Sequence, residues 1–249
     1  MSSLPEAVEV LGVRIHPVTE SELVDVLTTW AREGSRRKVY YVNAHALNLA
    51  HDNSEFRDLL NRADLVYCDG FGAKWAARAM GQMLPERMAI PDWIDHLLER
   101  LDDGVRLFLL GDEAEVVEHC ADFMARRHPG LRIAGIHDGF FDPSGDENRA
   151  ICEMINGNDA TVLLVGMGMP RQETWIESNV EDLNVALALG VGALFGVYSG
   201  DRPRAPRWMT ENGIEWLGRL AVEPRRMSHR YVIGNTRLVA RVARKRMSR

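Results

Sequence analysis

The sequence of 249 residues has few cysteines and no long apolar run. Its three cysteines, Cys68, Cys120 and Cys152, are far apart and form no C-x-x-C pair. This spacing excludes a cysteine-built zinc site and a disulfide framework, and it fits a reducing compartment. No uncharged apolar stretch approaches the roughly 20 residues that a transmembrane helix needs, and the first residues show no signal-peptide pattern. We therefore expect a protein that is soluble or that binds to a membrane surface.

Two common nucleotide-binding motifs are also missing. The chain has no G-x-x-x-x-G-K-[ST] phosphate loop. Its three G-x-G turns each lack the third glycine of the dinucleotide fingerprint, because Trp75, Arg171 and Phe195 occupy that position. A nicotinamide-dependent dehydrogenase is therefore not expected. The three turns are Gly70-Phe71-Gly72, Gly166-Met167-Gly168 and Gly190-Val191-Gly192.

Short apolar runs alternate with helical patterns along the first 200 residues. The runs are β-branched or aliphatic and several end at glycine, which is typical of strands buried on both faces. Such alternation predicts a Rossmann-like α/β fold, with a mostly parallel sheet and helices on both of its faces. The predicted strands are residues 38–42, 65–67, 105–110, 131–134, 161–165 and 185–189. The clearest helical stretches are residues 21–32, 92–101, 113–127 and 170–178.

The charge of the chain changes sign near residue 200, where the alternation also ends. From Arg202 onward there are thirteen Lys or Arg against three Glu, whereas the rest of the chain has seventeen bases against thirty-three acids. We therefore predict an α/β core over residues 1–200 and a helical basic appendage over residues 201–249. An anionic partner and an ordinary solvated helix face both agree with the charge of the appendage.

The last part of the appendage has the pattern of an amphipathic basic helix. Apolar residues recur at Met227, Tyr231, Leu238 and Val242, and basic residues fill the other faces. Gly234 is expected to weaken this helix. The apolar stripe would either pack against the core or lie on a membrane, and the almost purely cationic polar face favours an anionic membrane surface.

An acidic residue, Asp69, stands between a predicted strand and a helical pattern. In an open parallel sheet, ligands bind beyond the carboxyl ends of the strands, and glycine turns there let backbone amides approach the phosphates and sugar of a nucleotide. An Asp-Gly pair most often marks a turn or a helix cap. At the ligand edge of a sheet the same carboxylate can act as a general base. The sequence alone leaves both roles open.

Asn43 and His45 follow the predicted strand 38–42. They would lie beside Asp69 if this strand neighbours strand 65–67. Asn43 also suits a helix cap, and His45 a packed or solvent-facing position. The spacing of these residues in the sequence does not decide between the two roles.

Gln172 and Glu173 fall in the first turn of a predicted helix that begins at Pro170, and we expect both to face the crevice. Gln172 would bind a sugar hydroxyl or a uracil edge. Glu173 is undecided between a role in the site and a favourable interaction with the helix dipole.

Nothing in the sequence requires a metal ion, since the histidines are scattered. Without a metal, a departing diphosphate needs arginines, because the planar guanidinium is permanently charged and binds phosphate through two hydrogen bonds. The appendage contains many arginines.

An ordered set of motifs in this chain resembles the WecG/TagA/CpsF glycosyltransferases, glycosyltransferase family 26. Any one of the motifs is weak, but the set follows the family's order from about Val8 to Tyr231 and is highly specific as a whole. It comprises Asn43, Cys68-Asp69-Gly70-Phe71-Gly72, residues 166–173, Gly190-Val191-Gly192, Arg204-Ala205-Pro206, residues 213–217, Arg219, residues 223–226 and Arg230-Tyr231.

The resemblance implies an inverting glycosyltransferase that needs no metal ion and no other cofactor. It would move a sugar from a UDP-sugar to a sugar on a polyprenyl diphosphate, during polysaccharide or teichoic acid biosynthesis. The best-known members add N-acetylmannosamine to GlcNAc-diphospho-undecaprenol, and others transfer glucose or N-acetylmannosaminuronic acid. The protein would be cytoplasmic, with its appendage associated peripherally with the inner face of the cell membrane. Whether it forms a homo-oligomer stays open.

The resemblance also assigns roles to individual residues. Asp69 becomes the catalytic base that takes the proton from the attacking hydroxyl of the acceptor, and Gln172 becomes the active-site glutamine. The C-terminal arginines of the family fall on Arg219 and Arg226. The full set of predicted substrate-binding residues is Tyr41, Asn43, Gly70, Gly72, Gly166, Gly168, Gln172, Gly192, Arg204, Arg219, Arg226, His229 and Arg230.

Two positions depart from the family pattern. Tyr41 stands where a threonine is common, which affects the expected contact near the sugar. His229, with Arg230 beside it, stands where a further arginine is expected, so one phosphate contact would become pH-dependent if the histidine takes it over.

Two other functions agree with parts of the sequence. A non-catalytic protein that binds nucleotide-sugars would use the same glycine turns, with Asp69 as a cap. A nucleic-acid binder is suggested by the basic appendage alone, and the acidic core and the lack of aromatic residues among the appendage's arginines argue against it. We therefore predict no nucleic-acid partner.

Overall fold

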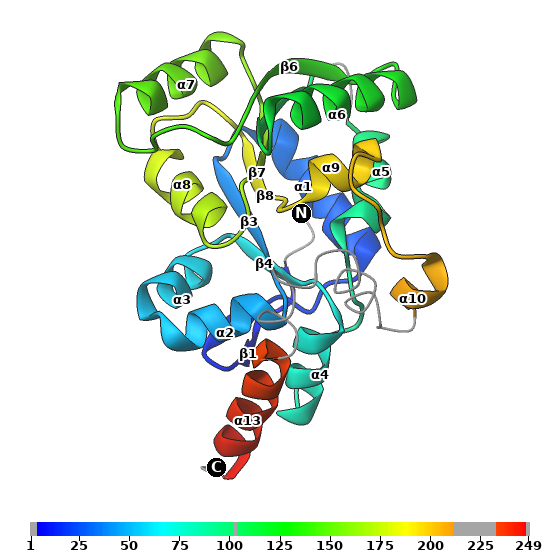
Figure 1. Ribbon diagram of the computed structural model, residues 1–249, viewed down its shortest axis with the longest axis vertical. Coiled ribbons are helices and arrows are strands. Elements are labelled where there is room, and N and C mark those ends of the chain that lie inside the picture. The colour runs from blue at the N-terminus through cyan, green and yellow to red at the C-terminus, as the bar shows by residue number, and fades with distance from the viewer. Residues whose placement is uncertain (1–3, 102–103, 212–232, 248–249) are drawn as a thin grey trace.

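The computed structural model describes residues 4–101, 104–211 and 233–247, which form an α/β fold around a six-stranded sheet (Figure 1). The strand order is β4-β3-β8-β7-β5-β6, and every neighbouring pair is parallel. The predicted fold class is confirmed, and all six predicted strands lie within a few residues of their expected positions. The strands are β3 (Arg37–Val42), β4 (Leu65–Cys68), β5 (Arg106–Gly111), β6 (Arg132–His137), β7 (Val162–Gly166) and β8 (Leu187–Gly190).

The central strands are buried on both faces of the sheet. In β3, Tyr40 and Val42 lie in one hydrophobic cluster, whereas Val39 and Tyr41 lie in the other. Strands β4, β7 and β8 are buried along their whole length. Successive side chains of one strand thus enter two different cores, which explains why these strands appear in the sequence as unbroken apolar runs.

Helices cover both faces of the sheet, as predicted (Figure 1). The four predicted helical stretches correspond to α1 (Glu20–Glu33), α5 (Ile90–Leu98), α6 (Ala114–Arg127) and α8 (Arg171–Asn179). One face is covered by α2 (Ala44–Asp52), α3 (Ser54–Asn61), α4 (Phe71–Ala79), α7 (Asp146–Gly157) and α8 (Arg171–Asn179). The opposite face is covered by α1 (Glu20–Glu33), α5 (Ile90–Leu98), α6 (Ala114–Arg127) and α9 (Leu194–Ser199).

A small antiparallel hairpin near the N-terminus was not predicted. Its strands, β1 (Val8–Val10) and β2 (Val13–Ile15), have only three residues each, which is too short for a periodicity to be recognised. Leu11 and Gly12 form the turn with positive φ angles of 51° and 87°. The hairpin continues into the main body, because the backbone amide of His16 donates to the carbonyl oxygen of Val66 at 2.7 Å.

Two described helices belong to the predicted appendage, α10 (Arg207–Glu211) and α13 (Gly234–Met247). Helix α13 packs on α2 and α4, and its Leu238 and Val242 are buried in the same cluster as α2. Arg241 donates to the carbonyl oxygen of Asn48 at 3.0 Å and forms an ion pair with Asp52 at 2.5 Å. The described half of the apolar stripe therefore packs against the core.

The other half of that stripe, Met227 and Tyr231, lies outside the described residues. Gly234, which was expected to weaken the helix, is the first residue of α13 and does not interrupt it. The division of the chain into residues 1–200 and 201–249 stays a prediction. Across the described residues, the helices that form are too short or too polar to span a bilayer.

Candidate functional site

The carboxyl ends of β4, β3, β8 and β7 lie in a row at one edge of the sheet. The parallel register pairs Val42 with Cys68 and Val165 with Gly190. The neighbourhood of β3 and β4, on which the placement of Asn43 beside Asp69 depended, is therefore confirmed. From β3 the chain enters α2 on one face of the sheet, whereas from β8 it enters α9 on the other face. In open α/β sheets, ligands bind at the strand ends where the chain diverges in this way.

Asp69 lies at this edge, directly after β4. Its backbone amide donates to the carbonyl oxygen of Val42 at 2.9 Å, and the residue is half-buried. The N-cap position of α4 belongs to Gly70, with φ 94°, so Asp69 is not the N-cap residue of this helix. Burial, followed by the charge of Asp69, raises the pKa of the neighbouring Cys68 thiol to about 12. The geometry thus agrees with a carboxylate at the mouth of the sheet.

Asn43 lies beside the turn that contains Asp69. Its side-chain oxygen accepts from the backbone amides of His45 at 3.0 Å and Ala46 at 3.1 Å, so it caps α2. A Cβ atom on Gly70 would lie 3.8 Å from the Cβ of Asn43. The cap is observed, and a contact of Asn43 with substrate stays a prediction.

Gly72 sets the distance between α2 and α4. A Cβ atom at this position would lie 2.7 Å from the Cβ of Ala44, closer than real Cβ contacts allow. Any side chain at residue 72 would therefore push apart the two helices that follow the strand ends. Gly72 thus acts through packing, and its predicted contact with substrate stays a prediction.

Gln172 joins the glycine turns that follow β7 and β8. Its side chain is fully buried, and Oε1 accepts from the backbone amides of Gly168 at 3.2 Å and Gly192 at 2.8 Å. Its Nε2 atom donates to Glu173 at 2.7 Å and lies against Gly190, where an added Cβ would approach it within 2.8 Å. Gln172 therefore fixes the shape of two turns at once, and its predicted contact with the sugar stays a prediction.

Tyr41 belongs to β3, which lies between β4 and β8 in the sheet. It lies in the same cluster as Tyr67, with ring centroids 6.3 Å apart. A Cβ atom on Gly192 would collide with the Tyr41 hydroxyl group, and Gly192 also has a positive φ of 57°. The hydroxyl group thus lies at the glycine turn after β8, and the contact of Tyr41 with the sugar stays a prediction.

Gly166 completes the predicted set of turn glycines at the strand edge. An added Cβ would lie 2.7 Å from the ring of Phe195 and 3.0 Å from the carbonyl oxygen of Gly192. This position therefore admits no side chain while α9 keeps its place. Gly168, with a positive φ of 75°, has no such close neighbour, and its glycine is required by conformation.

A cationic group near the end of β4 was not predicted from the sequence. The guanidinium of Arg87 lies 5.4 Å from the ring centroid of Phe71 and bonds Asp92 at 2.9 Å. Asp92 also accepts from Arg204, one of the predicted substrate-binding residues. No local signal in the sequence distinguishes Arg87 from the other arginines.

The loop that carries Arg87 is held against the end of β4. The amide of Met88 donates to the carbonyl oxygen of Cys68 at 3.0 Å, and Lys74 of α4 donates to the carbonyl oxygen of Pro85 at 2.8 Å. Both Lys74 and Arg87 act electrostatically on Cys68. Two cations from different elements therefore converge on the turn that contains Asp69.

A fourth glycine turn, after β5, was also missed. Gly111 lies so close to Gly166 that an added Cβ would be 2.5 Å from its carbonyl carbon. The next residue, Asp112, is buried and forms an ion pair with Arg202 through contacts of 2.5 and 2.7 Å. This pair fastens the chain after α9 to the strand edge. The glycine at the end of an apolar run was visible in the sequence and could have indicated this turn.

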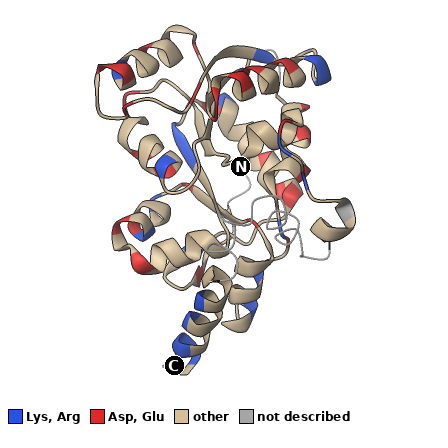
Figure 2. Ribbon diagram, viewed as in Figure 1, with Lys and Arg blue, Asp and Glu red and all other residues tan. Residues whose placement is uncertain are grey.

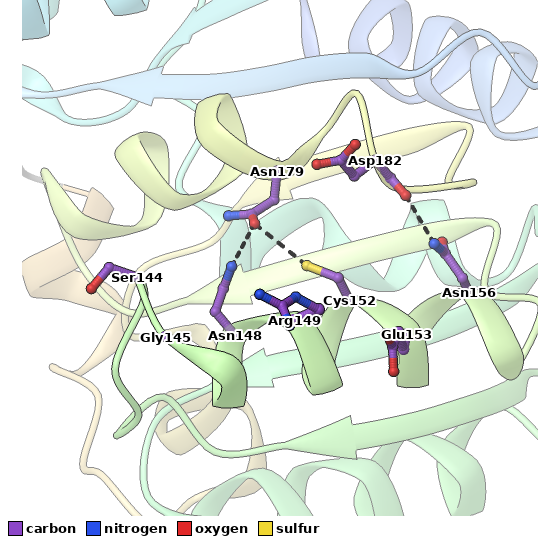
Figure 3. A pocket seen from close by; sticks show the side chains of 9 residues that line it. All are labelled: Ser144, Gly145, Asn148, Arg149, Cys152, Glu153, Asn156, Asn179 and Asp182. Atoms are coloured by element: carbon purple, nitrogen blue, oxygen red, sulfur yellow. Dashed lines mark hydrogen bonds between the residues drawn. The ribbon is translucent and has the colours of Figure 1, made fainter.

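A surface cavity of about 330 Å³ lies elsewhere, between α7 and α8 (Figure 3). Asn148 donates to Asn179 at 2.7 Å and accepts from Trp175 at 2.6 Å, while Asn156 donates to the carbonyl oxygen of Asp182 at 2.8 Å. These hydrogen bonds connect α7 with α8 and with the turn that follows α8. None of the residues predicted for the site lines this cavity.

Four predicted site residues, Arg219, Arg226, His229 and Arg230, lie outside the described residues. Within the described ranges, no three His, Cys, Asp or Glu side chains gather into a group that could hold a metal ion. Metal independence stays a prediction about the reaction.

Comparison with known proteins gives one consistent result. The model of the family "Glycosyl transferase WecG/TagA/CpsF family" matches residues 8–249. Among curated proteins, the N-acetylglucosaminyldiphosphoundecaprenol N-acetyl-beta-D-mannosaminyltransferases of Staphylococcus aureus strains NCTC 8325 / PS 47 and COL are each 28% identical to this chain over 223 residues. The similarity covers 88% of this chain and 86% of each relative.

Proposed function

The chain belongs to the WecG/TagA/CpsF family of glycosyl transferases, and we propose that it transfers N-acetylmannosamine from a UDP-sugar to GlcNAc-diphospho-undecaprenol. The similarity to the staphylococcal N-acetylmannosaminyltransferases supports this choice of donor sugar and acceptor. The UDP moiety and the inversion at the anomeric carbon follow from the family resemblance.

The observation that carries the proposal is the position of Asp69 at the crevice, next to the glycine turns. A half-buried carboxylate at this edge can accept the proton of the acceptor hydroxyl as that oxygen attacks the anomeric carbon. Attack from the side opposite UDP converts an α-linked donor into a β-linked product. Asp69 is thus the proposed general base.

The donor would lie along the turns after β7 and β8. These turns place bare backbone at the strand edge, where phosphate and ribose groups can approach closely, and Gln172 holds both in one shape. The Tyr41 hydroxyl beside Gly192 is the proposed contact to the donor sugar. Asn43 and Gly70 would border the acceptor side, next to Asp69.

Cations are proposed to take the place of a metal ion at the departing diphosphate. Lys74, Arg87 and Arg204 come from three different segments near the end of β4. Arginine suits this role because its charge is permanent and its fork matches phosphate oxygens. The predicted phosphate contacts at Arg219, Arg226, His229 and Arg230 would add to this group.

The basic appendage is proposed to bind an anionic membrane, where the lipid-linked acceptor resides. With Leu238 and Val242 packed inward, the exposed residues of α13 include Arg237, Arg244, Lys245 and Arg246, and Figure 2 shows basic residues along this helix. Each base near an anionic surface contributes on the order of 1 kcal/mol. Flotation with anionic vesicles and with neutral vesicles tests this role, and equal recovery with both would contradict it.

A donor screen tests the reaction itself. UDP-N-acetylmannosamine, UDP-N-acetylmannosaminuronic acid, UDP-glucose and UDP-N-acetylglucosamine are each incubated with a short-chain GlcNAc-diphospholipid, and products are identified by mass spectrometry. We expect transfer from UDP-N-acetylmannosamine without added metal. If only another donor supports transfer, that donor's sugar replaces N-acetylmannosamine in the proposal. If no donor leads to release of UDP, the result supports a non-catalytic binding protein.

A further inference from the structure

Glu173 is a buried carboxyl that the proposed reaction leaves without a role. Its side chain is fully buried, and its Oε2 atom has no hydrogen-bond partner. The other oxygen, Oε1, accepts from Gln172 Nε2 at 2.7 Å. No Lys, Arg or His of the described ranges forms an ion pair with it. Ionising such a group is costly, because burial removes water and no cation replaces it.

The contact with Glu173 fixes the orientation of the Gln172 amide. The Gln172 oxygen must point at the two backbone amides of Gly168 and Gly192, since an inverted amide would oppose N–H donors to N–H donors. A carboxyl oxygen on the other side, which accepts from Nε2, supports the same orientation. Glu173 therefore holds both glycine turns through Gln172.

The neutral and the ionised carboxyl both provide this acceptor, but they differ in charge. In the neutral form the proton resides on the carboxyl group and the site carries no charge. In the ionised form a negative charge lies two hydrogen bonds behind the turns where the donor's diphosphate is proposed to bind. Burial raises the pKa of Glu173 to about 7, so both forms are accessible near neutral pH.

Given the donor site proposed above, we propose that Glu173 is a positioning residue whose proton is coupled to donor binding. The neutral carboxyl keeps Gln172 and the two turns in shape without placing a negative charge behind the diphosphate. Donor binding favours the neutral form, and by linkage the neutral form favours the donor. Affinity for the donor is then highest below neutral pH and falls as the pH rises through the range in which Glu173 ionises.

The other titratable groups around Glu173 are held in ion pairs or are themselves buried. Glu177, one turn further along α8, bonds Lys38 of β3 at 2.8 Å and Arg62 after α3 at 2.7 Å, and these partners lower its pKa. The Tyr40 hydroxyl lies 3.5 Å from the carbonyl oxygen of Glu173, and burial raises its pKa far above the range. The two glycine turns on β7 and β8 carry no titratable side chain.

Binding of UDP-N-acetylmannosamine to the full chain, measured by calorimetry between about pH 6 and about pH 8.5, tests the coupling. The diphosphate of a UDP-sugar has no group that titrates in this range, unlike free UDP. We expect the Kd of the wild type to rise about tenfold, which corresponds to a change of one unit in the pKa of Glu173 on binding. For Glu173→Gln, an isosteric and uncharged replacement, the Kd is expected to change by less than about twofold over the same pH range.

Two further measurements separate this role from a structural one. Titrations in buffers of different ionisation enthalpy count protons, and the wild type is expected to take up protons on binding near pH 7.5, whereas Glu173→Gln takes up none. The matched control is Glu177→Gln on the same helix, which is expected to keep the wild-type pH dependence. The comparison of the two glutamate variants identifies Glu173 as the group that takes up the proton.

The outcomes are distinct. A pH-independent Kd in the wild type, or a pH dependence that persists in Glu173→Gln, overturns the coupling while the proposed function stands. Absence of binding at every pH overturns the donor assignment and the coupling together. Proton uptake by the wild type that is lost in Glu173→Gln and kept in Glu177→Gln supports the coupling.

Discussion

The two halves of the strand edge are built in opposite ways. On the side of β3 and β4, Asp69 is half-buried and cations such as Lys74 and Arg87 converge on the turn. On the side of β7 and β8, Gln172 and Glu173 are fully buried and bond to backbone amides and to each other. The side of β3 and β4 carries several charged groups, whereas the side of β7 and β8 contains the buried carboxyl of Glu173. We infer that the first side performs the chemistry and that the second keeps the donor site in shape.

The largest effect is expected from Asp69→Asn, on the charged side. The amide cannot accept the proton of the acceptor hydroxyl, and loss of a positioned general base costs about a hundred- to ten-thousand-fold in rate. Donor binding should stay close to that of the wild type, because the turns after β7 and β8 are untouched. Single-turnover kinetics and donor titration together check this, and near wild-type turnover would remove Asp69 from the mechanism.

A large effect on the buried side is expected from Gly192→Ala. The added Cβ would collide with the Tyr41 hydroxyl group, and alanine is strained at a φ of 57°. Together these changes should lower the free energy of unfolding by about 4 kcal/mol. Chemical denaturation measures the loss.

The double variant Tyr41→Phe, Gly192→Ala sharpens this test, since it removes the hydroxyl group and leaves only the backbone strain. Partial recovery of the free energy of unfolding is expected. If the double variant is as unstable as Gly192→Ala alone, the steric part of the explanation is wrong.

Glu173→Gln is expected to have a smaller effect, and it should raise the stability of the protein where Gly192→Ala lowers it. The folded chain holds this proton up to about pH 7 while the unfolded chain releases it near 4.5, so wild-type stability falls as the pH rises between these values. The variant has no such loss. Its free energy of unfolding, relative to that of the wild type, should therefore rise by about 3 kcal/mol between pH 4.5 and pH 8. Denaturant titrations at both pH values measure the difference.

Glu177→Gln provides a control with the reverse sign. The pKa of Glu177 is lowered by Lys38 and Arg62, so its contribution to stability is present above the ordinary pKa and is lost at lower pH. Its removal should therefore destabilise the protein at neutral pH. A similar response in both glutamate variants would contradict the distinction between the buried and the paired carboxyl.

The smallest effect is expected from Arg87→Lys. Lysine keeps the charge but lacks the planar fork that binds two phosphate oxygens and lies over the Phe71 ring. We expect the KM for the donor to rise about tenfold with little change in kcat, an effect of about 1.4 kcal/mol. Arg36→Lys, a surface arginine whose contact with Glu181 is 3.8 Å, is the matched control.

The sequence predicted the sheet well because each central strand is buried on both faces. Residues 161–165 contain only one polar side chain, and the observed β7 is buried along its whole length. The β1–β2 hairpin was missed because strands of three residues carry no readable period. Hydrophobic periodicity therefore predicts a helix or strand only where the element is long enough to contain the period more than once.

The site could be predicted only in part. The junctions after strands pointed to Asp69 and Gln172, since turn and strand are close in sequence. The contact of Gln172 with Gly192 joins residues 20 positions apart, and the approach of Arg87 to the end of β4 depends on how a loop folds back. Such contacts are set by tertiary packing, and no local pattern records them.

The anchorage of α13 has a consequence for how the enzyme meets a substrate confined to a plane. Leu238 and Val242 pack beside α2, and Arg241 bonds to Asn48 and Asp52, so several contacts hold this helix on the body. If its outer face binds a lipid surface as proposed, the strand edge is presented to that surface at one tilt. An acceptor diffusing in two dimensions then encounters Asp69 with part of the orientational search already completed.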